Sequence, residues 1–291
     1  MSILPPALLV ASLIALAGSV AIALAAGALR FAGAARLALS DGSTVETSTP
    51  SRVVRGTTHA GVVLALALLA AALIIRTVVA GHAPWSNLYE FSQSFAAGIL
   101  LVYLLLEHRA PIRGIAPIVA LLSAALVGYA LTLDPRIDPL VPALQQPFLL
   151  TIHVGSAMLA YAISAVAFAA TVAELVQRRV PGGVGWLPEA SVCRVAAHRA
   201  VLLAFPVLTA AIALGSVWAN LAWRSYWSND PKELAAAATW LVYGAYLHAA
   251  GRRDRYAAIA PWLLVLGFGA VLFTYIGAGL FFVGEHSYAA P

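Results

Sequence analysis

The feature that most constrains this chain is a series of long apolar runs separated by short polar stretches. A helix needs about 20 residues to cross the apolar core of a bilayer. Eight runs approach or exceed that length, and the third and seventh are the shortest. The first run has no basic segment before it and is followed by arginines, which favours a membrane anchor over a cleaved signal peptide. The runs predict spans at roughly 5–29, 57–79, 94–107, 115–133, 148–176, 200–219, 234–250 and 257–283.

The composition supports this interpretation. Hydrophobic residues make up 62% of the 291 residues and charged residues 10%, whereas soluble domains carry about 25% charged residues. The single cysteine, Cys193, excludes a disulfide scaffold and any CxxC thiol chemistry within the chain. We therefore predict an all-α fold, a polytopic membrane helix bundle of about eight spans, which forms one integral membrane domain over residues 1–291.

The basic residues predict the orientation in the bilayer. Of the 17 Lys and Arg, 13 fall in the connections between spans one and two, three and four, five and six, and seven and eight. By the positive-inside rule these connections face the cytoplasm, so both termini face outward. The net charge of +5 then reflects topology, and with no nucleic-acid-binding motif in the chain we expect the lipid bilayer as a partner and no nucleic acid. Walker, HExxH and GxSxG sequences are also absent.

Four of the seven histidines lie at two matching depths. His59 and His248 are at the inner ends of spans two and seven, while His153 is just inside the outer end of span five and His286 follows span eight at its outer end. Imidazole in a bilayer usually faces the bundle interior, a cavity or a cofactor, and it is a common axial ligand of haem iron. Each histidine alone is equally well explained by a hydrogen bond between helices. Two pairs favour haem, because one porphyrin takes two axial ligands.

The outer connection between spans six and seven is rich in tryptophan. Within residues 218–233 it holds Trp218, Trp223, Tyr226 and Trp227, followed by Asp230-Pro231-Lys232-Glu233. Interfacial aromatic belts spread over many helix ends, but here the tryptophans concentrate in one loop, which favours stacking of a flat ligand. Asp230 can cap the next helix, and Lys232 or Arg224 can pair with the propionates of such a ligand.

This loop resembles the WWD signature of haem-handling proteins, and most closely that of the CcsA (ResC) family of system II cytochrome c biogenesis. The resemblance extends to PWSNLYEF at 84–91, FLLTIHVGSAMLAYA at 148–162, TWLVYGAYLH at 239–248 and HSY at 286–288. It runs from about residue 56 to the end of the chain and is most specific in the last 140 residues.

The resemblance implies a function. Proteins of this family bind haem b, carry it outward across the membrane and deliver it for covalent attachment to CXXCH motifs of apocytochrome c, together with a CcsB (ResB) partner. It implies His59 and His248 as a transmembrane pair of haem iron ligands, His153 and His286 as an external pair, and the loop residues Trp218, Trp223, Trp227 and Asp230 as haem contacts. It also implies a holocytochrome c synthase (haem lyase) subunit, with no single residue marked as catalytic.

Two departures and two alternatives accompany this interpretation. Arg224 stands where the family usually has glycine, and Asn229 stands where it usually has a signature tryptophan. The first alternative is a di-haem membrane cytochrome b that carries electrons, and the second is a non-catalytic, haem-poor interaction subunit. We expect the protein in a bacterial cytoplasmic membrane, because the alanine-rich composition favours this over a thylakoid membrane.

Overall fold

The computed structural model describes residues 4–37, 49–137, 139–140, 142–145, 147–252 and 258–286, and every regular element among them is helical. The first half of the chain contributes α1 (Leu4–Leu37), α2 (Thr49–Ala80), α3 (Leu88–Glu107), the short 3-10 helix η1 (Arg113–Ile115), α4 (Ala116–Ala130) and a second 3-10 helix η2 (Pro142–Gln145). The second half contributes α5 (Pro147–Arg179), α6 (Ala190–Trp223), α7 (Pro231–Gly251) and α9 (Ala260–Leu272), which continues through the π-helix η3 (Phe273–Gly277) into α10 (Ala278–Phe281).

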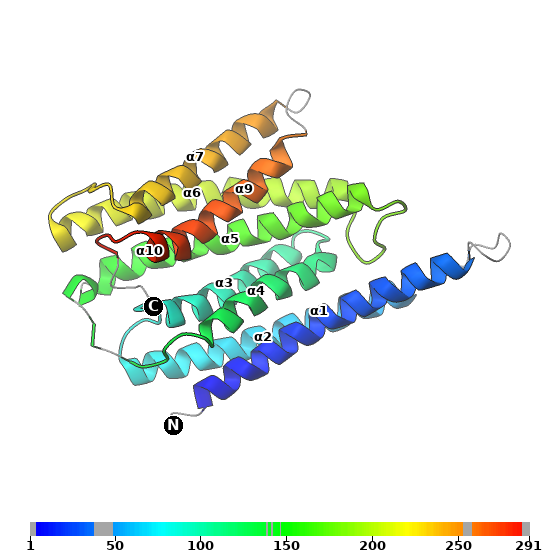
Figure 1. Ribbon diagram of the computed structural model, residues 1–291, viewed down its shortest axis with the longest axis horizontal. Helices are drawn as coiled ribbons and strands as arrows, with labels where there is room; N and C mark the ends of the chain where they lie inside the picture. Colours follow the sequence, from blue (N-terminus) through cyan, green and yellow to red (C-terminus); the bar gives the residue numbers. More distant parts are fainter. Residues whose placement is uncertain are drawn as a thin grey trace.

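The long helices run side by side along one axis (Figure 1). The pair α1 and α2 packs against α3 and α4, these pack against α5, and α5 packs in turn against α6 and α9. Helix α7 lies on α6 and α9, at the far side of the bundle from α1 and α2 (Figure 1). Helix α1 begins, and α10 ends, at the same end of the bundle (Figure 1). We call this end, which also carries the α6–α7 loop, the outer end, and we call the opposite end the inner end.

The predicted spans match the observed helices closely. Among the described residues, seven helices are long and apolar enough to cross a membrane, and they correspond to every predicted span except the seventh. The run at 234–250 does form helix α7, but its composition is less apolar because it contains Thr239, Tyr243, Tyr246 and His248. The chain is therefore a multi-pass membrane protein built as a helix bundle.

Three helices begin well before their apolar runs, the first of them α2, which starts at Thr49 rather than at 57. Helix α3 starts at Leu88 rather than at 94, because its first two turns bury the polar residues Glu90, Ser92, Gln93 and Ser94 inside the bundle, where they make hydrogen bonds. Helix α6 starts at Ala190 rather than at 200 and contains Pro206 in its interior. The additional turns carry polar residues, which the apolar pattern alone excluded from a span.

Turn chemistry explains where several helices start. Gly81 adopts a φ of +73° directly after α2, a conformation that glycine adopts without steric strain. The Asn87 side chain then accepts a hydrogen bond from the Glu90 amide at 2.9 Å and caps α3. Prolines occupy the first turns of α4, α7 and α9, where the missing N–H leaves no helical bond unmade. The caps of α3 and α7 lie at the outer end, which holds the candidate site, whereas α4 and α9 begin at the inner end (Figure 1).

Candidate functional site

A cavity of about 190 Å³ lies at the outer end of the bundle. Its walls come from the segment before α3, from α5, α6 and α7, from the π-helix and from the chain after α10. Most of the lining is apolar, including Phe91, Leu208 and Trp218, and the polar side chains include His153, Lys232 and His286. A mostly apolar cavity with a few converging polar groups is the usual form of a ligand site.

His153 lies on α5 and faces α6. Its Nδ1 donates a hydrogen bond to the Ala211 carbonyl oxygen at 3.0 Å, and its ring stacks on Trp218 with centroids 5.9 Å apart and an interplanar angle of 13°. Because a carbonyl oxygen only accepts, the neutral ring carries its proton on Nδ1 and its lone pair on Nε2. His153 is thus held in the tautomer that can bind a metal through Nε2.

Gly215 makes this position of His153 possible. A Cβ atom at residue 215 would lie 2.5 Å from His153 Cε1, which is closer than van der Waals contact allows. The glycine lets the α6 backbone approach the imidazole, so the ring fits between Ala211 and Trp218. The sequence analysis did not single out Gly215, although it is a glycine inside a helix, a position that often has a packing reason.

His286 approaches Trp218 from the chain after α10. Its Nδ1 lies 2.8 Å from Asp230 Oδ1, and its ring contacts the edges of Trp218 and Trp223 at centroid distances of 5.8 and 5.2 Å. The backbone of Gly284 passes close to the same carboxylate, since a Cβ there would lie 2.3 Å from Asp230 Oδ2. The structure therefore brings His153, His286, Trp218, Trp223 and Asp230 together, although they come from four separate segments.

Asp230 has two structural roles. Its side chain accepts a hydrogen bond from the Lys232 amide at 2.8 Å and, with Glu233, forms a capping box at the start of α7. Burial by itself raises the pKa of Asp230, but the hydrogen bond and charge of His286, together with backbone amides, outweigh burial and lower the pKa to about 2. A carboxylate that stays ionised fixes the imidazole orientation and increases its strength as a ligand.

The tryptophans form the apolar centre of the site. Trp218 is 1% exposed and meets Trp223 edge to face at 4.8 Å, and neither indole N–H has a hydrogen-bond partner among the described residues. Buried donors without partners are costly, and a polar group of a ligand would relieve that cost. Trp227 is 43% exposed and lies at the cavity rim, so the predicted aromatic residues occupy both the floor and the rim.

The backbone accounts for Asn229 and shows why glycine is usual at the position of Arg224. Arg224 follows the end of α6 with a φ of +63°, a left-handed conformation that favours glycine at this position of a helix. Asn229 has a φ of +60°, which asparagine tolerates well, and its Oδ1 accepts a hydrogen bond from Trp227 Nε1 at 2.9 Å. The asparagine thus holds the loop in shape, while the arginine occupies a strained position on the exposed side of the loop.

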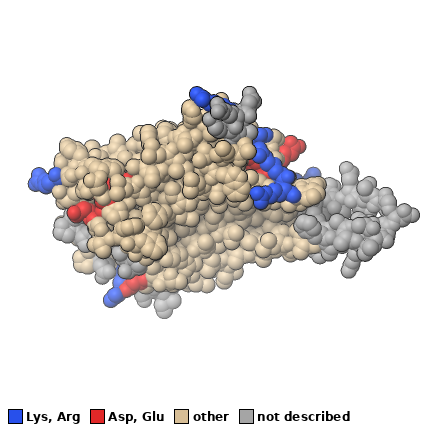
Figure 2. Space-filling model, turned by 45° about the horizontal axis from the view of Figure 1, so that its top comes forward, with Lys and Arg blue, Asp and Glu red and all other residues tan. Residues whose placement is uncertain are grey.

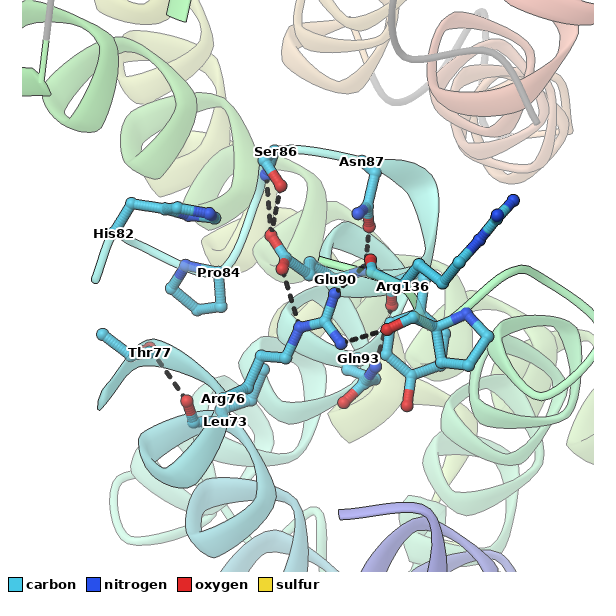
Figure 3. A network of polar contacts seen from close by, with 12 residues as sticks. Leu73, Arg76, Thr77, His82, Pro84, Ser86, Asn87, Glu90, Gln93 and Arg136 are labelled. Atoms are coloured by element: carbon cyan, nitrogen blue, oxygen red, sulfur yellow. Dashed lines mark hydrogen bonds and ion pairs between the residues drawn. The ribbon is translucent and has the colours of Figure 1, made fainter. Parts of the chain in front are cut away.

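A buried ion pair supports the cavity wall at Trp85–Leu88. Arg76, 7% exposed on α2, donates to Glu90 Oε1 at 2.8 Å and to the backbone carbonyls of Pro135 and Arg136 (Figure 3). Glu90 in turn accepts from the Ser86 amide and hydroxyl. The sequence analysis did not single out Arg76, although an ionisable residue inside a span is itself a signal of a functional or structural role.

The inner histidines are not brought together. His59 Nδ1 lies 2.8 Å from Glu107 Oε2 on α3, whereas His248 is exposed on α7, which lies on the far side of the bundle from α2 (Figure 1). One turn before His248, Gly244 lies beside the ring of Phe205, which a Cβ there would contact at 3.7 Å. Within this structure, His59 and His248 do not flank one ligand.

Comparisons with known proteins identify the family of the chain. The sequence model of the family described as cytochrome C assembly protein matches residues 85–286. The chain is 34% identical over 280 residues to the cytochrome c biogenesis protein CcsA of Synechococcus elongatus, which covers 79% of this chain and 86% of the relative. The CcsA protein of Guillardia theta is 30% identical, covering 79% of this chain and 84% of the relative.

A solved structure confirms the fold. The protein titled cytochrome c heme lyase CcmF superposes with a TM-score of 0.59 at 22% sequence identity. The match covers 92% of this chain but 46% of that one, so the present chain spans about half its length. The resemblance of the tryptophan-rich loop and its flanking segments to CcsA proteins is therefore confirmed over most of the sequence, and the chain belongs to the cytochrome c assembly protein family.

Proposed function

We propose that this chain binds haem b in the outer cavity and delivers it for covalent attachment to CXXCH motifs of apocytochrome c, acting as a haem lyase subunit with a CcsB (ResB)-like partner. The observation that carries the proposal is the convergence of His153 and His286 on Trp218, each with Nδ1 held by an acceptor. Two imidazoles that line one cavity beside a buried indole form a donor set that fits haem iron and the porphyrin plane.

Formation of the thioether bond depends mainly on how the haem vinyl group and the cysteine thiol are positioned. A cysteine thiol of the apocytochrome adds across a haem vinyl group, so that sulfur bonds to one vinyl carbon and the proton goes to the other. No oxidant or reductant is consumed in this addition. Holding the vinyl group beside the thiol makes the reaction effectively unimolecular. The chain's own residues would hold the haem iron at His153 and His286 and the porphyrin plane against Trp218 and Trp227, with Trp223 supporting Trp218 from behind. The exposed rim at Tyr226 and Trp227 leaves a side from which the apocytochrome can approach.

The test is a maturation assay. The chain is co-expressed with its CcsB-like partner and a CXXCH reporter in cells that lack their own c-type maturation, and the denatured reporter is stained for covalent haem. We expect staining with the wild type, little with His153→Ala or His286→Ala, and full staining with the control His82→Ala, whose side chain lies outside the cavity. Unchanged staining after removal of His153 or His286 contradicts the proposal.

The two alternatives leave different signatures in the same experiment. Reversible low-spin haem that copurifies in stoichiometric amounts, without any staining of the reporter, favours a membrane cytochrome b. Purification with the partner but without haem favours an interaction subunit. For a transmembrane haem, His59 and His248 remain proposed ligands. His59 contacts Glu107 through Nδ1 only, and because the structure does not bring His248 to it, each is proposed to bind haem iron at a separate position at the inner end.

We also propose that the outer end of the bundle faces away from the cytoplasm of a bacterial cell. Figure 2 shows the larger group of Lys and Arg toward the right-hand end of the visible face and fewer at the left-hand end, while the middle of this face consists of uncharged residues. In a Cys193→Ala background, we expect a membrane-impermeant thiol reagent to label Ser228→Cys on intact cells. Ser191→Cys, at the inner end of α6, is expected to react only after lysis. The reverse pattern would overturn this orientation.

A further inference from the structure

Among the residues that line the outer cavity, Lys232 is the one Lys or Arg side chain. We propose that Lys232 binds a carboxylate of the ligand in this cavity, namely a haem propionate, and thereby sets which edge of the porphyrin enters beside α7. This inference rests on the proposed haem binding and deepens it. Lys232 lies in the first turn of α7, directly after the cap residue Asp230, and lines the same cavity as His153 and His286.

The neighbouring acidic groups are already used. Asp230 contacts His286 Nδ1 and the Lys232 backbone amide. Glu233 accepts from the backbone amides of Ser228 and Asp230 at 2.9 and 3.2 Å. Across the described part of the chain, the Lys232 ammonium has no carboxylate within 4.0 Å and no hydrogen-bond acceptor. The cation of this cavity is therefore available for an anion that comes from outside the protein.

The surroundings make such an anion favourable. The Lys232 side chain is half-buried, and the Cε atom lies close to Gly279, where a Cβ would be 3.9 Å away. Burial lowers the pKa of Lys232, and the nearby charge of Asp230 only partly opposes this effect. A cation that has lost hydration without gaining a partner is costly, so a carboxylate that reaches it gains a strong, charge-assisted hydrogen bond.

The structure distinguishes Lys232 from the other cation that the sequence offered. Arg224 is exposed and does not line the cavity, although it lies in the same tryptophan-rich loop. Arg224 is therefore a matched control: it has the same charge and belongs to the same segment, but it lies outside the site. Because the propionates and vinyl groups of haem occupy different edges of the porphyrin, a carboxylate held at Lys232 directs the vinyl edge elsewhere in the cavity.

The test compares haem with haem dimethyl ester, in which both propionates are neutral. The purified full chain is titrated with each in detergent, and the Soret band gives the dissociation constants. We expect the wild type to bind haem on the order of 10-fold more tightly than the ester. Lys232→Met should bind both with the weaker affinity of the ester, while Lys232→Arg and Arg224→Met should keep the preference for haem.

The outcomes separate this inference from the proposed function. If the wild type binds both compounds equally, or if Lys232→Met keeps the wild-type preference, haem binding stands and the role of Lys232 is wrong. If the wild type binds neither compound, the proposed function fails, and this inference fails with it. A thermal unfolding curve for each variant identifies loss of folding, and the Lys232→Arg variant supplies the comparison if Lys232→Met proves unstable.

Discussion

Asp230 Oδ1 lies 2.8 Å from His286 Nδ1, and the same carboxylate caps helix α7. One side chain thus fixes both the start of a helix and the orientation of an imidazole from a segment 56 residues further along the chain. This link ties the tryptophan-rich loop to the C-terminal segment. It also makes the two functions of the residue experimentally separable, because asparagine caps helices nearly as well as aspartate.

The first prediction concerns Asp230→Asn. The cap should survive, so the midpoint of thermal unfolding should change little, whereas the charged hydrogen bond to His286 is lost. We expect haem affinity to fall by about 10- to 100-fold, the range seen when such outer partners of histidine ligands are removed. Asp230→Ala should lose in addition about 1 kcal/mol of stability, because it removes the cap. Wild-type haem affinity in Asp230→Asn would contradict this role.

The second prediction concerns pH. The pKa of Asp230 is lowered from 3.8 to about 2 in the folded protein, so its contribution to stability is complete above the unfolded value and is lost as the pH falls through about 2. On the order of 1–2 kcal/mol is involved. Between pH 5 and pH 2 the unfolding midpoint of the wild type should therefore fall more than that of Asp230→Asn. Equal slopes for the two proteins would show that the carboxylate is not stabilised as described.

Sequence patterns predicted the fold well because membrane spans leave a direct signal. Apolar runs of about 20 residues reflect the thickness of the bilayer, so the helices were placed to within a few residues except where polar residues extend them, as at Glu90 in α3. The outer site was also predictable in part, because His153, Trp218 and His286 carry the family motif. Their convergence required the tertiary structure.

Other features of the site could not be predicted from the sequence. Arg76 supports Trp85–Leu88 while it also bonds to the α4–α5 connection, 59 residues away. No local sequence pattern predicts a contact between segments so far apart. Depth matching suggested that His59 and His248 form a pair, but depth does not specify which layer of the bundle a helix occupies. Likewise, the left-handed backbone at Arg224 emerges only from the path of the loop.

The third prediction follows from that backbone. Arg224→Gly should stabilise the protein by about 0.5–1 kcal/mol, because glycine adopts a positive φ without strain, although it also loses more entropy on folding. Haem binding should be retained, since Arg224 does not line the cavity. The measurement is the thermal unfolding midpoint of the purified variant together with its haem affinity. A lower midpoint would show that the arginine side chain makes a compensating contact.

The fourth prediction concerns the buried pair of Arg76 and Glu90. Removing one partner leaves an uncompensated charge, so Arg76→Met or Glu90→Gln should each cost about 3–5 kcal/mol. The double variant should recover part of this loss. Arg136→Gln is the control, because the Arg136 side chain is 79% exposed and points away from the network in Figure 3. It should cost less than about 0.5 kcal/mol. Equal effects of Arg76→Met and Arg136→Gln on unfolding would contradict the structural role of the pair.

The fifth prediction tests the space that Gly215 provides for His153. In Gly215→Ala the new methyl group would lie 2.5 Å from the imidazole, so the ring must turn and lose its hydrogen bond to Ala211. We expect haem affinity to fall on the order of 10-fold, as for loss of a partner that orients a histidine ligand.

Gly155→Ala is the matched control, because it lies two residues from His153 on the same helix and its Cβ meets no atom within 4 Å. The control should bind haem normally and gain up to about 1 kcal/mol from helix propensity. If the two alanine variants bind haem equally well, the position of His153 against Ala211 has no part in ligand binding. A specific loss in Gly215→Ala, with normal folding, instead identifies the close approach of α6 to this imidazole as a requirement of the site.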